Sequence, residues 1–161
     1  MEKGLVQVFN GNGCGKSSAA LGKALQAAAA GKNVVVIQFL KGSGLTDSGY
    51  LQRLEPEIKI FRFEKFPGDF NELPPERKTE EINNIRNGLN FAKKVLTTGE
   101  CKMLILDEVL GLIDNDIMSI EDLKALIDAR DEETDIIMTG IAIDDKICRM
   151  ADEVNRIETV K

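Results

Sequence analysis

A glycine-rich segment near the N-terminus carries residue types that bind nucleotide phosphates. It reads Gly-Asn-Gly-Cys-Gly-Lys-Ser-Ser over residues 11–18, and it joins the apolar run 5–9 to an alanine-rich stretch. In a turn from strand to helix, glycines allow backbone N–H groups to turn toward an anion, and the helix N-terminus adds its positive dipole. Lys16 can then reach the phosphates, and the Ser17 hydroxyl can bind a magnesium ion. The segment therefore predicts a nucleoside triphosphate site.

The spacing of this segment departs by one position from the strict phosphate-loop pattern G-x-x-x-x-G-K-[ST]. The pattern requires a glycine where this chain has Asn10. Asparagine tolerates left-handed backbone geometry better than most residues. We therefore interpret the segment as a phosphate loop, against the alternative of a glycine-rich turn that contains Gly-Lys-Ser by chance. The residues expected to bind ATP are Asn10, Gly11, Asn12, Gly13, Cys14, Gly15, Lys16, Ser17 and Ser18.

An acidic pair closes a second apolar run further along the chain. The run Met-Leu-Ile-Leu over residues 103–106 precedes Asp107 and Glu108. Because the parallel strands of an α/β sheet end at the same edge, a carboxylate at this position would lie beside the phosphate loop. The pattern is weak by itself, since any buried strand can end in Asp-Glu. Together with the phosphate loop it indicates a Walker B strand.

Composition excludes several other functions. The chain has 161 residues, a formal net charge of -6 and no histidine. The negative charge argues against nucleic acid or an anionic membrane as a partner, and no apolar run is long enough for a transmembrane helix. Without histidine, chemistry must rest on carboxylates, lysine, serine and a metal ion. Three scattered cysteines, and an N-terminus that leaves no room for a signal peptide, lead us to expect a cytoplasmic protein with a single P-loop nucleotide-binding domain over residues 1–161.

Apolar runs and helical patterns alternate along the chain. This alternation predicts an α/β fold of the P-loop NTPase type, a three-layer sandwich whose central sheet is mostly parallel. Proline at the start and glycine at the end mark a long amphipathic helix, and Ser119 with Asp122 resembles a capping box. The expected strands cover residues 5–9, 34–40, 58–63, 103–106, 136–140 and 154–160. The expected helices are residues 17–30 and 50–54, a long helix from Pro74-Pro75 to near Thr98-Gly99, a helix after Ser119 through Leu123, Leu126 and Ile127, and residues 144–151.

Four segments resemble the P-loop type of ATP:corrinoid adenosyltransferases, also called cob(I)alamin or cob(I)yrinic acid a,c-diamide adenosyltransferases. The glycine loop that fails the strict Walker spacing is itself typical of this family. The Gln-Phe-Leu-Lys-Gly segment distinguishes the family from generic kinases and ATPases. The matching segments are residues 9–20, 36–42, 104–108 and 138–140.

The resemblance implies a group transfer in which a reduced Co(I) corrinoid attacks the 5′ carbon of ATP and triphosphate leaves. ATP with Mg²⁺ and a corrinoid co-substrate are then expected, with a flavoprotein reductant and a homodimeric assembly as further expectations. Lys16 and Glu108 become the candidate catalytic residues. Ser17, Asp107 and Glu108 become the candidate magnesium ligands.

The corrinoid half of the site departs from the family pattern. Cys14 and Ile141 stand where lysine and arginine are common, and relatives continue beyond the position of Lys161 through a Lys-His segment. The family's aromatic pair over the corrin is represented by phenylalanines in the segment 63–70, for which core packing is the alternative. Two functions therefore stay open beside the transfer: a noncatalytic or regulatory ATP-binding relative, and another P-loop ATPase or kinase. The corrinoid-side candidates are Gln38, Lys41, Phe66 and Phe70.

Overall fold

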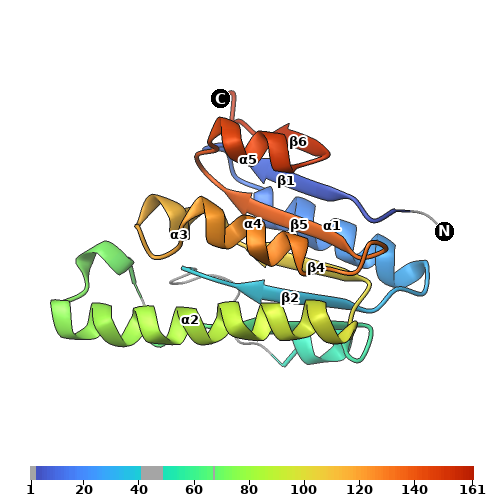
Figure 1. Cartoon of the computed structure of the whole chain (residues 1–161), viewed down its shortest axis with the longest axis horizontal. Helices are drawn as coiled ribbons and strands as arrows, with labels where there is room; N and C mark the ends of the chain where they lie inside the picture. Colours follow the sequence, from blue (N-terminus) through green and yellow to red (C-terminus); the bar gives the residue numbers. More distant parts are fainter. Residues whose placement is uncertain (1–2, 41–48, 67) are drawn as a thin grey trace.

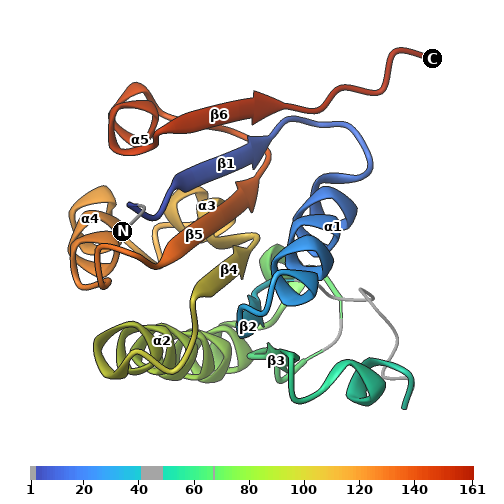
Figure 2. The same ribbon diagram turned by 90° about the vertical axis from the view of Figure 1, so that its right-hand side faces the viewer.

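The computed structural model describes residues 3–40, 49–66 and 68–161. Within these residues, six strands form one sheet in the order β3-β2-β4-β5-β1-β6, and neighbouring strands run parallel (Figure 1; β3 is labelled in Figure 2). The strands are β1 (Val6–Asn10), β2 (Val34–Gln38), β3 (Ile58–Arg62), β4 (Met103–Asp107), β5 (Asp135–Gly140) and β6 (Glu153–Arg156). The α-helices are α1 (Lys16–Ala29), α2 (Pro75–Thr98), α3 (Val109–Asp114), α4 (Ile120–Asp128) and α5 (Asp145–Met150), with short 3-10 helices η1 (Leu51–Leu54) and η2 (Phe70–Glu72).

Helices cover both faces of the sheet, which makes the three-layer sandwich expected from the sequence. Figure 2 shows α1 on one face and α2, α3 and α4 on the other. Successive strand residues point to opposite faces, so strands β1 to β5 contribute to both cores: Val36 and Ile105 pack with α1, while Ile37 and Leu104 pack with the opposite helices. This two-sided burial explains why β2, β4 and β5 are almost uninterrupted apolar runs.

Alanines and one glycine allow the helices to pack closely. Ala20, Ala24 and Ala27 lie buried on the inner side of α1. In α2, Gly88 faces two phenylalanines, and a Cβ atom added to it would lie 2.7 Å from Cγ of Phe63. A larger residue there would force α2 away from the strand edge, because packed ring and helix backbone could not both keep their positions.

Most of the element boundaries predicted from the sequence are confirmed. The helix α2 begins at Pro75 and ends before Gly99, whose φ of 67° is left-handed. The capping box of α4 is present in full: the Ser119 hydroxyl accepts the N–H of Asp122, and the Asp122 carboxylate accepts the N–H of Ser119. The 58–63 run forms β3, an edge strand and less buried than its neighbours, as expected.

Two strand ends and one helix differ from the prediction for identifiable reasons. The second strand ends at Gln38 and not at residue 40, because Leu40 adopts a left-handed φ of 51°. The last strand ends at Arg156, and the segment 157–159 continues along the glycine loop instead of along β1. The helix α3 was not predicted, since it follows β4 with Glu108 in a left-handed conformation and without a capping side chain.

None of the helices in the described ranges has the length and apolar character needed to cross a bilayer.

Candidate functional site

The glycine loop of residues 11–15 connects β1 to α1 at the carboxyl edge of the sheet (Figure 2). Gly15 precedes α1 with a φ of 107°, a conformation that L side chains rarely adopt. Nζ of Lys16 donates to the carbonyl oxygen of Gly13 at 3.1 Å, so its ammonium group lies against the loop. The loop therefore has the strand, turn and helix order that a phosphate site requires.

The C-terminal segment 157–159 packs against the glycine loop and accepts hydrogen bonds from it. The N–H of Gly13 donates to the carbonyl oxygen of Ile157 at 3.0 Å, and the N–H of Cys14 donates to Oγ1 of Thr159 at 3.2 Å. A Cβ atom on Gly11 would lie 2.2 Å from the Ile157 carbonyl oxygen, and one on Gly13 would lie 2.8 Å from backbone atoms of the same segment. Two of the three alternating glycines are thus required by the close approach of another chain segment.

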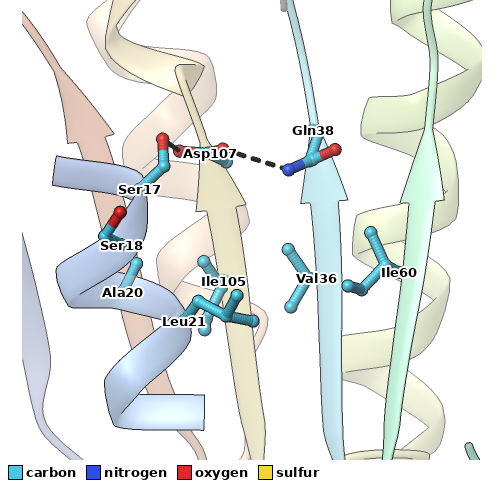
Figure 3. A pocket seen from close by; sticks show the side chains of 9 residues that line it. All are labelled: Ser17, Ser18, Ala20, Leu21, Val36, Gln38, Ile60, Ile105 and Asp107. Carbon is cyan, nitrogen blue, oxygen red and sulfur yellow. Dashed lines mark hydrogen bonds between the residues drawn. The ribbon is translucent and has the colours of Figure 1, made fainter. Parts of the chain in front are cut away.

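Asp107 stands at the centre of a hydrogen-bonded cluster at the ends of three strands. Its Oδ1 accepts from the Ser17 hydroxyl at 2.9 Å and from the Thr139 hydroxyl at 2.7 Å. Its Oδ2 accepts from Nε2 of Gln38 at 3.4 Å (Figure 3). The side chain is 2% exposed, and a buried carboxylate is stable only when such donors surround it. The first helical turn, β2, β4 and β5 are therefore tied together at this one group.

Glu108 follows directly in a strained backbone conformation. Its φ of 64° is left-handed, which costs a residue other than glycine on the order of 1 kcal/mol. Its N–H donates to Oγ1 of Thr139 at 2.8 Å, so one hydroxyl joins the backbone of Glu108 to the carboxylate of Asp107. Gly111 of α3 lies close to this carboxylate, since a Cβ atom added to it would lie 3.4 Å from Oε2 of Glu108, which is ordinary van der Waals contact. Strain that the surrounding structure maintains at such a position is typical of functional sites.

A small cavity opens beside the cluster, between α1 and the sheet. It has a volume of about 70 Å³. Its floor is apolar, and Ser17, Gln38 and Asp107 form its polar end (Figure 3). Gln38 is 3% exposed, and within the described part of the chain its Oε1 has no hydrogen-bond partner. A buried amide oxygen without a donor is costly, so a hydroxyl or amino group of a ligand would be favoured there. The residues around the cavity are Ser17, Ser18, Ala20, Leu21, Val36, Gln38, Ile60, Ile105 and Asp107.

The oxygen atoms near the loop fit a magnesium ion that is shared with a substrate. Across residues 3–40, 49–66 and 68–161, no group of three His, Cys, Asp or Glu side chains could hold a metal by itself. The structure instead brings the Ser17 hydroxyl to the Asp107 carboxylate, with Glu108 next in the chain. Mg²⁺ prefers this kind of sparse oxygen site, because it keeps several waters and takes further ligands from substrate phosphates.

The corrinoid-side candidates fall into two groups. Gln38 belongs to the Asp107 cluster, at the end of β2. Phe66 and Phe70 lie together in the segment between β3 and α2, where both are half-buried and line a narrow hollow with Leu40. Lys41, the fourth candidate, lies outside the described residues.

Two cationic side chains of α2 lie over rings of this aromatic segment. The guanidinium carbon of Arg77 lies 5.4 Å from the centre of the Phe66 ring, and Nζ of Lys78 lies 5.8 Å from that of Phe70. Phe63 differs from both, since its ring packs on Phe91 of α2 with the centres 5.8 Å apart. Phe63 therefore shows the core packing given as the alternative for these phenylalanines, whereas Phe66 and Phe70 lie at the edge of the hollow.

The two positions that depart from the family pattern both lie at the loop. Cys14 is exposed within it, and the carbonyl oxygen of Ile141 accepts the N–H of Gly11 at 3.0 Å. Ile141 is 59% exposed, so an apolar side chain stands beside the loop at a position where arginine is common in the family. Neither position supplies a positive charge, so Lys16 is the cationic residue of the segment 11–18.

Sequence reasoning missed two contributors to the site. Thr139 was recognised within a matching segment but was given no role, although a polar residue at the end of an apolar run is the same signal that identified Asp107. The segment 157–159 was expected to continue a strand, and its sequence carries no sign that it packs on the glycine loop.

The parallel sheet with helices on both faces is an α/β fold of the P-loop NTPase-like class. The family model for "ATP:corrinoid adenosyltransferase BtuR/CobO/CobP" matches residues 2–161. The chain therefore belongs to the ATP:corrinoid adenosyltransferase family.

Individual relatives agree with this assignment. The corrinoid adenosyltransferase of Escherichia coli (strain K12) is 30% identical over 160 residues, which cover 99% of this chain and 79% of the relative. The corrinoid adenosyltransferase CobA of Salmonella typhimurium is 31% identical with the same coverage. That of Pseudomonas aeruginosa is 26% identical over 161 residues, covering 99% of this chain and 77% of the relative.

Proposed function

We propose that this protein transfers the 5′-deoxyadenosyl group of ATP to the cobalt of a reduced Co(I) corrinoid and releases triphosphate. Membership of the family carries the activity. The observation that carries the placement of the site is the contact between the Ser17 hydroxyl and the Asp107 carboxylate, at 2.9 Å. It joins the glycine loop to the acidic pair at the carboxyl edge of the sheet, where ligands of α/β proteins bind.

In this transfer the electron pair of Co(I) forms the bond to the 5′ carbon. The bond between that carbon and the phosphate oxygen breaks, and the leaving triphosphate keeps the electron pair of that bond. No proton has to be removed from the nucleophile, so the lack of histidine is compatible with the reaction. The protein must instead stabilise a leaving group that carries several negative charges.

Residues 10–18 are proposed to hold the triphosphate through the helix dipole and backbone N–H groups other than those of Gly11, Gly13 and Cys14, which donate to residues 141, 157 and 159. Lys16 would turn from the Gly13 carbonyl oxygen to the phosphates, where a charge-assisted contact is worth about 1.5–3 kcal/mol. Because Cys14 and Ile141 add no positive charge to the loop, the contribution of Lys16 is expected to be large.

The Ser17 hydroxyl and the carboxylates of Asp107 and Glu108 are proposed to hold Mg²⁺. When bound, the ion would neutralise negative charge on the triphosphate. The Thr139 hydroxyl donates to Asp107 and accepts the N–H of Glu108, and Nε2 of Gln38 donates to the other Asp107 oxygen. They would keep the Asp107 oxygens aimed at the Ser17 side of the cluster.

The corrinoid is proposed to lie at the carboxyl edge beside Gln38, Lys41, Phe66 and Phe70. The hollow next to the two rings contacts Leu40, which follows β2, so this segment adjoins the nucleotide end of the site. A flavoprotein that supplies the reduced corrinoid and a homodimeric assembly are proposed on the family resemblance alone.

Titration calorimetry with Mg-ATP tests the nucleotide half. Lys16→Ala should weaken binding by about 10- to 100-fold, and Lys23→Ala, a change on the same helix beyond the loop, serves as the control. Equal ATP affinity in Lys16→Ala and the control would contradict the assignment of the loop.

A further inference from the structure

A buried carboxylate outside the nucleotide site binds the backbone of the aromatic segment. Glu81 lies in the second turn of α2 and is 4% exposed. Both its oxygens lie 3.1 Å from the backbone nitrogen of Lys65, and Oε2 accepts the N–H of Phe66 at 2.9 Å. A buried carboxylate is unfavourable unless it is hydrogen-bonded, and within the described residues these two amides supply such bonds.

Further contacts with α2 lie on either side of this one. Upstream in the segment, the ring of Phe63 packs on Phe91, in the later turns of the helix. Downstream, Arg77 lies over the ring of Phe66. In the sequence of α2, Glu81 lies between Arg77 and Phe91. Glu81 binds the backbone of the segment, whereas Arg77 and Phe91 contact its side chains. Contacts with α2 therefore hold the segment 63–66, which follows β3 at the carboxyl edge of the sheet.

The neighbouring residue of α2 provides a natural comparison. Glu80 contacts the same lysine, but through its side chain: Oε2 of Glu80 lies 2.8 Å from Nζ of Lys65. Both of these side chains are about half exposed, and solvent-exposed ion pairs of this kind contribute little. Two adjacent glutamates therefore hold the same residue, one by a buried bond to backbone and one by an exposed ion pair.

We propose that Glu81 is a positioning residue for corrinoid binding. By accepting the N–H groups of Lys65 and Phe66, it fixes the backbone that places Phe66 at the edge of the hollow beside Leu40. It does not contact the nucleotide cluster through any contact seen in the described ranges. This inference rests on the proposed function, in which Phe66 lies on the corrinoid side.

The test compares Glu81→Gln with Glu80→Gln in the full chain. Glutamine keeps the size of the side chain but removes its charge and replaces one accepting oxygen with a donor, which faces the Lys65 N–H in either orientation of the amide. Hydrogen exchange measured by NMR should show faster exchange at Lys65 and Phe66 in Glu81→Gln, by about 10-fold or more. With cobalamin reduced chemically to Co(I) as substrate, its KM should rise by about 10-fold, while the KM for ATP stays within about twofold.

Glu80→Gln should match the wild type in both measurements. If Glu81→Gln does not fold, Glu81→Asp is measured instead, because it keeps the charge but is one methylene too short to reach both amides. Equal increases in the two KM values would show a general loss of structure and overturn the proposal.

Unchanged amide exchange or an unchanged corrinoid KM in a folded variant would overturn it as well. Failure of the wild type to form any adenosyl-cobalt would instead refute the proposed function, which separates the two claims.

Discussion

Thr139→Val tests the connection between the two acidic residues of the site. The substitution keeps the volume of a side chain that is fully buried, but it removes the hydroxyl that donates to Asp107 and accepts from the N–H of Glu108. A hydrogen bond to a charged group is worth about 1.5–3 kcal/mol, and a donor left without a partner adds to the loss. Since the two terms are not additive, we expect the free energy of unfolding to fall by about 2–3 kcal/mol.

Urea unfolding followed by circular dichroism measures this loss, because the chain has no tryptophan and one tyrosine. For a chain of this size the melting temperature should fall by about 4–12 °C. Thr139→Ser is the matched control, since it keeps the hydroxyl and loses one methyl group, worth about 1 kcal/mol. The Mg²⁺ concentration needed for half-maximal activity should rise in the valine variant and not in the serine variant. A valine variant as stable as the wild type, with the same Mg²⁺ requirement, would refute the role of Thr139.

Three further predictions follow from other contacts. Gly13→Ala should weaken ATP binding, because its Cβ would collide with the backbone of residues 157–159. Titration calorimetry with ATP checks this, with Gly22→Ala as the control, since a Cβ there meets no atom of the described residues within 4 Å. Glu108→Gln should raise the Mg²⁺ requirement in a steady-state titration without lowering the melting temperature, and an unchanged requirement would remove Glu108 from the metal site. Burial raises the pKa of Cys101 from 9.0 to about 11, so the thiol loses its proton at lower pH in the unfolded chain than in the folded one. The free energy of unfolding should therefore fall as the pH rises between these two values. Urea titrations in which Cys101→Ala shows the same fall as the wild type would contradict this.

The sheet and most helices could be predicted because local sequence and tertiary packing favour the same structure. The apolar runs of β2, β4 and β5 are buried on both faces, and α2 has proline and glycine at its ends. The capping box of α4 is a local signal that needs no tertiary contact. Where consistent local signals exist, sequence alone specifies the element.

The parts that could not be predicted depend on contacts between distant segments. Glu81 resembles its neighbours in a helix rich in charged residues, and only the packing of the 63–66 segment shows that it is buried. Gly11 and Gly13 suggested an open path to phosphate, whereas their lack of side chains accommodates the segment 157–159. Both cases involve backbone groups of one segment meeting another, which the sequence pattern does not record.

The most direct test of the central claim is the identity of both products of one reaction. The protein is incubated without oxygen with ATP, Mg²⁺ and cobalamin reduced to Co(I), and the cobalt product is followed by its absorbance spectrum before and after exposure to light. Phosphorus NMR of the same sample identifies the phosphate product. The account predicts a light-sensitive cobalt–carbon product together with intact triphosphate in equal amounts. ADP with no cobalt–carbon product would contradict it and indicate a kinase or ATPase, and unchanged ATP and corrinoid would indicate a nucleotide-binding protein without transferase activity.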